Sequence, residues 1–313
     1  MFRHRLCSVL LFNQTLGMYS KGVKVARLAY VNGQYVPISR ASVSIQDRGF
    51  QFGDGIYIVI ACVGGYLIDL QDHLNHLEKY LEQSFINFPV QRETLEPIFR
   101  EVIRRNRIKT GSLYVQITRG NAKRRHAFPT PLPKSTLVII PYQHSFNLDA
   151  DSIDEVSIIF QDDLRWKHPF IKSTSLFPTV LLRQAAADKK AFECWLLDEK
   201  GKISEGASSN AFIVMRDGIL RTRPDDGSLV PGVTRNRILK IAELLGIPVQ
   251  LKAFTRNEFY AASEAFLTGA TSMVKAVVRS GDWTIGSGNV GPVTQKLAAA
   301  YYEFCRLHGQ QSQ

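Results

Sequence analysis

Alternation of apolar and polar side chains predicts two β-hairpins near the start of the chain. They cover residues 28–36 and 56–69 and turn at Asn32-Gly33 and Gly64-Gly65. Asn-Gly is a dipeptide that type I′ hairpin turns prefer, because both of its residues adopt positive φ with little strain. Two further apolar runs predict strands at residues 113–118 and 136–142.

Apolar residues at helical spacing predict two helices in the same half. The first covers residues 70–85, where the apolar positions are Leu70, Leu74, Leu77, Leu81 and Phe85. The second lies near residues 95–105 and is expected to begin at Pro97, because proline is favoured in the first turn of a helix. Together these elements predict an α+β domain over residues 28–145.

Polar residues interrupt the pattern between residues 143 and 151, so we expect a linker at residues 146–152. The second domain is then expected to span residues 153–313. Residues 1–27 are predicted to be a leader, either disordered or an extension from an upstream start codon, with Met18 nearer the true start.

The second half is richer in strands than a doubly wound sheet requires. Strands are predicted at residues 156–160 and 264–268, helices at 179–190 and 234–245, and a hairpin pairing 192–197 with 210–214. Because regular β-α-β alternation is missing from the pattern, we predict a two-domain α+β / α/β fold.

Composition and charge exclude several classes of protein. No stretch of the sequence approaches the ~20 apolar residues of a membrane-spanning helix. The formal net charge of +11 would allow nucleic acid as a partner. Basic and acidic residues alternate, however, and aromatic residues are not interleaved with a basic stripe, so we expect no such partner. The four cysteines stand far apart with no CxxC pair, which predicts a reducing, cytoplasmic location.

Common nucleotide and metal motifs are missing from the sequence. It contains no GxxxxGK[ST], HExxH or GxSxG pattern, and Gly53-Asp54-Gly55 lacks the third glycine of a Rossmann fingerprint. His73 and His76 stand three residues apart without an evident third ligand, so we predict no metal site.

Three groups in the second half could act on one ligand. Lys172 follows an apolar run, and a lysine in a dry pocket loses its charge readily and can form an imine. Glu205 lies at the edge of the predicted hairpin, where a carboxylate could hold a protonated ring nitrogen. Residues 230–235 open a helix and residues 269–272 form a small-residue loop, and both suit a phosphate. Pyridoxal phosphate requires this combination of lysine, carboxylate and phosphate seat.

Four motifs occur in one order: DRGFQFGDGIY at residues 47–57, IKS at 171–173, EGASSN at 205–210 and GVTR at 232–235. With them the chain resembles the class IV (fold type IV) pyridoxal-phosphate aminotransferases, and most closely the D-amino-acid (D-alanine) aminotransferases. The resemblance implies pyridoxal 5'-phosphate at the domain interface, bound to Lys172 through an imine. It implies that Lys172 also moves the proton at the substrate α-carbon, that Glu205 binds the pyridine nitrogen and that Val230 packs against the ring. The other implied cofactor contacts are Ser208, Val233, Thr234, Ala270, Thr271 and His76.

The resemblance also implies a substrate site and a homodimer. Tyr57, Arg124 and His126 stand where D-amino-acid aminotransferases hold the substrate α-carboxylate, and in those enzymes the loop with Arg124 and His126 reaches the neighbouring subunit's site. Two positions depart from the family: His76 stands in place of an arginine that pairs with the phosphate, and Ile58 replaces a glutamate. We expect these changes to belong together, removing an ion pair as a unit and weakening phosphate binding.

The expected activity is ping-pong transfer of an amino group between D-alanine, or other D-amino acids, and 2-oxoglutarate. Alternatives of the same fold are a branched-chain L-amino-acid aminotransferase and an aminodeoxychorismate lyase, and the pair Arg124 and His126 weighs against both. A non-enzymatic protein that binds the cofactor weakly is the third alternative. Retention of Lys172 and Glu205 weighs against it.

Overall fold

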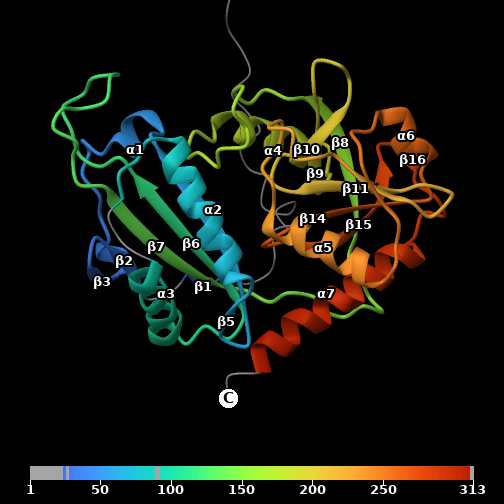
Figure 1. Ribbon diagram of the computed structural model, residues 1–313, viewed down its shortest axis with the longest axis horizontal. Coiled ribbons are helices and arrows are strands. Elements are labelled where there is room, and N and C mark those ends of the chain that lie inside the picture. Colours follow the sequence, from blue (N-terminus) through green and yellow to red (C-terminus); the bar gives the residue numbers. More distant parts are fainter. Residues whose placement is uncertain (1–23, 26–27, 89–91, 311–313) are drawn as a thin grey trace, which may run out of the picture.

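Two lobes make up the molecule, each built around its own β-sheet (Figure 1). The structure, a computed structural model, describes residues 24–25, 28–88 and 92–310 of the 313-residue chain. Most of the predicted leader therefore lies outside the described residues, although Lys24–Val25 form strand β1. The division at residues 146–152 stays a prediction; this segment lies between the last strand of one sheet and the first strand of the other.

The first sheet has the strand order β3-β2-β7-β6-β4-β5, with β1 paired to β7 and all pairs antiparallel. Both predicted hairpins are confirmed, and Asn32 and Gly33 have φ angles of 47° and 97°, as a type I′ turn requires. The strands are β1 (Lys24–Val25), β2 (Leu28–Val31), β3 (Gln34–Pro37), β4 (Gly55–Val63), β5 (Tyr66–Leu67), β6 (Gly111–Thr118) and β7 (Thr136–Gln143).

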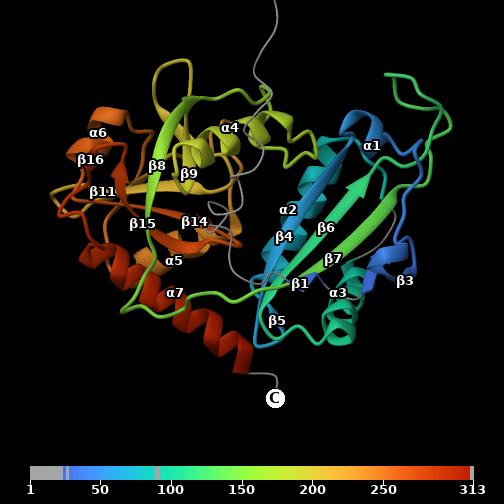
Figure 2. The ribbon, with the colours of Figure 1, turned by 180° about the vertical axis from the view of Figure 1, so that it is seen from behind.

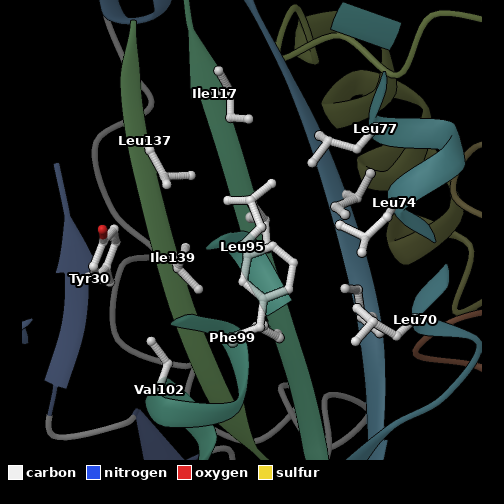
Figure 3. Close-up of a cluster of buried hydrophobic side chains, with 14 of the residues drawn as sticks. Tyr30, Leu70, Leu74, Leu77, Leu95, Phe99, Val102, Ile117, Leu137 and Ile139 are labelled. Atoms are coloured by element: carbon white, nitrogen blue, oxygen red, sulfur yellow. The ribbon is translucent and has the colours of Figure 1, made fainter. Parts of the chain in front are cut away.

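Two longer helices cover one face of this sheet. Leu70, Leu74 and Leu77 of α2 and Phe99 of α3 pack with alternate residues of β4, β6 and β7, as Figure 3 shows. Burial of this apolar face stabilises both helices more than intrinsic propensity does. The helical segments of the lobe are η1 (Ile38–Arg40), α1 (Arg48–Phe52), α2 (Leu70–Gln83) and α3 (Arg92–Asn106).

The prediction that a helix begins at Pro97 is wrong. Helix α3 begins at Arg92, and Pro97 lies inside it on the exposed side. The ring removes one backbone hydrogen bond, but Leu95 and Phe99 on the opposite side are buried in the core and hold the helix together. Helix α2 also ends earlier than predicted, at Gln83, because Phe85 adopts a positive φ of 54° and points out to solvent.

The second sheet has the order β10-β9-β8-β15-β14-β11-β12-β13, with β16 paired to β15. Strand β8 runs parallel to both β9 and β15, so β8, α4 and β9 form one β-α-β unit that the sequence pattern did not reveal. Its strands are β8 (Glu155–Asp162), β9 (Glu193–Leu197), β10 (Ile203–Gly206), β11 (Asn210–Val214), β12 (Leu220–Thr222), β13 (Val249–Leu251), β14 (Glu264–Gly269), β15 (Met273–Ser280) and β16 (Trp283–Thr284). The helices are α4 (Phe177–Asp188), α5 (Val233–Leu244), α6 (Arg256–Ala261) and α7 (Pro292–Gln310).

The hairpin predicted between residues 192–197 and 210–214 is also wrong. Strand β9 pairs with β10, whereas β11 pairs with β12 and β14. Strand β10 was not predicted because its sequence, Ile-Ser-Glu-Gly, contains only one large apolar residue and so shows no alternation. All four of its residues are nevertheless buried. The strand therefore forms because of its tertiary contacts, and the local sequence pattern does not predict it.

Helix α7 packs the two lobes together. Its residues Leu297 and Tyr301 share one buried cluster with Ala61 and Val63 of β4. Both ribbon views show it running beneath the second lobe and ending at the boundary with the first (Figures 1 and 2). The first lobe is therefore held against the second by apolar packing as well as by the chain connection. Among the described residues, no helix has the length and apolar character needed to cross a bilayer.

Candidate active site

A cavity of about 220 Å³ takes its walls from both lobes. The first lobe contributes Tyr57 and Val59 of β4 and residues of α2, the helix that lies on the side facing the second lobe (Figure 2). The second lobe contributes residues 165–179, the end of β10 and the start of α5. Segments far apart in sequence therefore meet at this one place.

Lys172 is attached to the first lobe by backbone hydrogen bonds. The Tyr57 amide donates to the Lys172 carbonyl at 3.0 Å, and the Thr174 amide donates to the Gly55 carbonyl at 2.9 Å. The Thr174 hydroxyl also donates to the Gly53 carbonyl at 2.9 Å. The Lys172 Nζ lies 4.8 Å from the centre of the Tyr57 ring. These bonds fix the base of the lysine side chain, so its amine is held beside an aromatic wall of the cavity.

Glu205 is a buried residue on the wall of the same cavity, with three of its acceptor positions filled. Arg165 Nη1 and the Val230 amide donate to Oε1 at 2.5 and 2.9 Å, and Asn210 Nδ2 donates to Oε2 at 3.0 Å. A carboxylate offers about four acceptor positions, so Oε2 keeps one for a donor in the cavity. Burial raises the pKa of Glu205, and the Arg165 guanidinium opposes that shift. This arrangement suits a protonated ring nitrogen, which donates a hydrogen bond and carries a compensating charge.

The start of α5 offers a seat for an anion. No side chain caps the helix, and its N-cap Gly232 lines the cavity with Val233 and Thr234. A Cβ at Gly232 would lie 2.1 Å from Asn210 Oδ1, so only glycine lets α5 begin this close to Asn210. Amide groups at a helix N-terminus bind phosphate well. Thr268 Oγ1, also on the cavity wall, is buried without a hydrogen-bond partner among the described residues.

Helix α2 adds two histidines to the wall, and both have depressed basicity. Burial, with the nearby His76 and Lys172, lowers the pKa of His73 to about 3. Burial also lowers the pKa of His76, and Lys79 adds to that shift. Since both pKa values lie below the ordinary value of 6.5, the imidazoles are largely uncharged at neutral pH. The uncapped start of α5 is then the group on this wall that suits an anion.

The structure brings together every predicted cofactor contact. The wall includes Lys172, His76, Glu205, Ser208, Val230, Val233, Thr234, Ala270 and Thr271, together with the predicted substrate contact Tyr57. These residues come from separate strands, loops and helices of both lobes. They fit pyridoxal phosphate, because an amine, a carboxylate with a free acceptor position and an uncapped helix N-terminus share one cavity.

Arg124 and His126 are not among the described residues that line this cavity. They are exposed on the loop between β6 and β7, at the outer edge of the first lobe beside α1 (Figure 1). The Arg124 guanidinium carbon lies 4.8 Å from the centre of the Phe52 ring, and the His126 and Phe52 ring centres are 5.6 Å apart. Within one chain, therefore, the two predicted carboxylate contacts stand apart from the predicted cofactor contacts.

Several site residues were missed from the sequence. Arg165 pairs with Glu205 and with Asp163, whose Oδ2 lies 2.7 Å from Arg165 Nη2. Glu193 is fully buried and accepts a hydrogen bond from the Ser208 hydroxyl at 2.7 Å. A charged residue beginning the apolar run at 193–197 was the available signal for Glu193. Arg165 gave no comparable signal, because Glu205, its partner on the cavity wall, lies 40 residues further along the chain.

The comparisons with known proteins agree with this geometry. The family model described as amino-transferase class IV matches residues 55–279. The chain belongs to this family. It is 34% identical to a D-alanine aminotransferase from Bacillus licheniformis over 270 residues, which are 86% of this chain and 94% of that one. It is 32% identical to a D-alanine aminotransferase from Staphylococcus aureus (strain N315) over 281 residues, 89% of this chain and 98% of that one.

Solved structures of branched-chain amino acid aminotransferases share the fold. The branched-chain amino acid aminotransferase of Escherichia coli superposes with a TM-score of 0.83 at 24% identity, covering 89% of this chain and 94% of that one. The T.th. branched-chain amino acid aminotransferase with pyridoxamine 5'-phosphate gives a TM-score of 0.83 at 26% identity, covering 90% of this chain and 94% of that one. The predicted family and the predicted fold type IV architecture are therefore confirmed.

Proposed function

We propose that this aminotransferase moves amino groups between D-amino acids, D-alanine among them, and 2-oxoglutarate. The observation that carries the proposal is the similarity to D-alanine aminotransferases at 32–34% identity over 86–89% of the chain. The sequence also has Tyr57, Arg124 and His126 at the positions that D-amino-acid aminotransferases use for the α-carboxylate. An arginine fork with histidine and tyrosine donors suits a carboxylate shared by both substrates.

Pyridoxal 5'-phosphate is the cofactor of the enzyme, and when bound it withdraws electrons from the α-carbon of the amino acid. Lys172 would hold it covalently, and the freed amine of Lys172 would take the α-proton. Glu205 would keep the ring nitrogen protonated, because its remaining acceptor position on Oε2 favours a donor there. The amides of Val233 and Thr234 at the start of α5 would hold the phosphate.

We infer further that the enzyme works as a homodimer in which Arg124 and His126 serve the neighbouring subunit's cavity. In their own chain they lie outside the cavity, on a loop at the edge of the first lobe. Large apolar side chains near this loop are exposed, including Phe50 at 73% and Phe128 at 53%. Exposed apolar groups gathered in this way are typical of a surface that a protein covers.

Separate assays of the two enantiomers test the proposed substrate class. Purified holoenzyme is incubated with 2-oxoglutarate and either D-alanine, L-alanine or L-leucine, and glutamate formation is followed. We expect D-alanine to be used at least about a hundredfold faster than either L-amino acid, because a fixed carboxylate trap presents only one enantiomer's α-hydrogen to Lys172. Faster turnover of L-leucine would instead assign the branched-chain activity for which the solved neighbours are named.

The spectrum of the purified protein separates these enzymes from a non-catalytic relative. A yellow absorbance that disappears when D-alanine is added shows that the cofactor is bound and takes up the amino group. A spectrum without this band, unchanged by added pyridoxal phosphate, would contradict the proposed activity.

A further inference from the structure

We propose that Arg48 of α1 is a positioning residue that fixes the loop at residues 123–128, and through it Arg124 and His126, for binding of the substrate carboxylate. This inference rests on the proposed function for what Arg124 and His126 bind. The anchoring itself follows from contacts within the described chain.

Arg48 belongs to a buried cluster of three charges. Arg48 and Arg119 are only 3–4% exposed and both bind Asp54, with Nε to Oδ2 distances of 2.7 and 2.8 Å. Burial of Asp54 raises its pKa, but hydrogen bonds from Arg119 and Arg48 outweigh that effect and leave the pKa below its usual value. Asp54 therefore stays ionised and holds both guanidinium groups in fixed orientations.

The remaining donors of Arg48 bind the backbone of the loop. Its Nη1 donates to the carbonyl of Arg125 at 2.6 Å and to that of Ala127 at 3.4 Å, and its Nη2 donates to the carbonyl of His126 at 3.2 Å. One guanidinium thus reaches three consecutive carbonyls in the segment that carries Arg124 and His126. A planar fork can do this, whereas a single ammonium group cannot satisfy the same geometry.

Aromatic side chains also contact the loop. Phe52, at the end of α1, contacts both the Arg124 guanidinium and the His126 ring. On the other side of Asp54, the Arg119 guanidinium carbon lies 3.7 Å from the centre of the Phe128 ring. Side chains of the short helix α1 therefore hold both the backbone of the loop, through Arg48, and two of its side chains, through Phe52.

The loop needs such anchors because it has little structure of its own. Residues 122–135 contain no helix or strand, and their backbone runs from β6 around the outer edge of the lobe to β7. An exposed loop without regular hydrogen bonds is mobile unless side chains hold it. Arg48 is buried and binds the loop directly, and Asp54 holds Arg48 in place.

The test compares Arg48→Lys and Asp54→Asn with the wild-type holoenzyme. Trypsin cuts after Lys123, Arg124 and Arg125, so its rate of cleavage there, located by mass spectrometry, measures how often the loop opens. For Arg48→Lys we expect cleavage to rise about tenfold, because the lysine keeps the charge but loses the fork. We expect KM for both D-alanine and 2-oxoglutarate to rise about tenfold, with kcat within about threefold.

The matched control is Arg221→Lys, which makes the same change in a less buried ion pair, with Glu258, in the second lobe. It should leave loop cleavage and both KM values at wild-type levels. Cofactor absorbance of each variant is recorded so that only folded, loaded enzyme is compared. Asp54→Asn should raise loop cleavage less than Arg48→Lys does, because the donors of Arg48 remain. If Arg48→Lys does not fold, the rate of loop cleavage in Asp54→Asn is the test, and a wild-type rate there would overturn the positioning role.

Unchanged loop cleavage in Arg48→Lys, or faster cleavage with unchanged KM, would overturn the positioning role. Arg124→Ala, measured in parallel, separates this result from a failure of the proposed function. If Arg124→Ala has wild-type KM values, Arg124 does not bind the substrate and the carboxylate role is wrong, whereas the cleavage rates still report whether Arg48 anchors the loop.

Discussion

At the scale of single residues, burial and ion pairing act in opposite directions on the carboxyl group of Glu205. Glu205 is held between Arg165, Asn210 and the Val230 amide. The desolvation of its carboxyl group opposes ionisation, and the nearby guanidinium favours it. Burial outweighs the guanidinium, so the pKa of Glu205 lies above its ordinary value. A protonated ring nitrogen beside Oε2 would favour the ionised carboxylate, which in turn would stabilise the positive charge on that nitrogen.

Replacing Glu205 with glutamine should lower kcat about a hundredfold, because the neutral amide no longer favours a protonated ring nitrogen. Arg165 would also lose a buried partner, so the free energy of unfolding should fall by about 3 kcal/mol. Steady-state kinetics and urea unfolding measure the two effects. Glu78→Gln, on an exposed ion pair with Arg92, is the control and should change neither. A Glu205→Gln enzyme with wild-type kcat would show that the carboxylate is not needed.

His76 is the second residue whose surroundings determine its charge and so its effect on cofactor binding. Because burial lowers its pKa, the imidazole brings little charge to the cavity at pH 7, where we propose that it stands near the phosphate. His76→Arg places a permanent cation there, and we expect the dissociation constant for pyridoxal phosphate to fall about tenfold. Titration of the apo protein, followed by absorbance, measures it. An unchanged constant would mean that the α5 amides alone set the affinity.

At the scale of elements, one helix serves both the core and the cavity. Helix α2 turns Leu70, Leu74 and Leu77 to the sheet, whereas His73 and His76 line the cavity. The leucines and the histidines occupy neighbouring faces of the helix. One face therefore packs on the first sheet while the next lines the cavity between the lobes. The apolar spacing predicted the helix and its core face, but it gave no means of telling that the neighbouring face lines a site.

The start of α5 is the element that, in our proposal, holds the phosphate. A Cβ at position 232 would lie 2.1 Å from Asn210 Oδ1, so Gly232→Ala must displace Asn210, which also donates to Glu205 and to the Val230 carbonyl. We expect the dissociation constant for pyridoxal phosphate to rise about tenfold. Titration of the apo variant provides the measurement. An unchanged dissociation constant would show that displacing Asn210 does not affect phosphate binding at the start of α5.

For the molecule as a whole, the site is formed by the meeting of two lobes and is completed, in our proposal, by a second chain. Helix α7 and β4 share a buried cluster, which fixes the lobes around Lys172 and Glu205. The exposed apolar residues beside α1 and its neighbouring loop remain without a cover in the single chain. A homodimer would bury them and bring Arg124 to the other cavity.

Phe50→Asp should therefore separate the dimer, because it places a charge where an apolar contact is expected. We expect wild-type protein at twice the chain mass of 35.2 kDa by light scattering, and the variant at the chain mass. Its KM for D-alanine should rise at least about tenfold, because Arg124 no longer reaches the neighbouring cavity. Leu244→Asp, at an exposed apolar position on α5, is the control. A dimeric Phe50→Asp protein would place the interface elsewhere.

Local sequence was enough to establish several elements and the chemistry of the site. Apolar periodicity located the hairpin at Asn32-Gly33 and helix α2, since these depend on neighbours in the chain. The motifs around Lys172 and Glu205 indicated the cofactor. The three-dimensional packing alone revealed that β10 pairs with β9, that Arg165 neutralises Glu205 and that Arg48 holds a distant loop. Those contacts join residues far apart in sequence, and their energy comes from burial and pairing that no local pattern records.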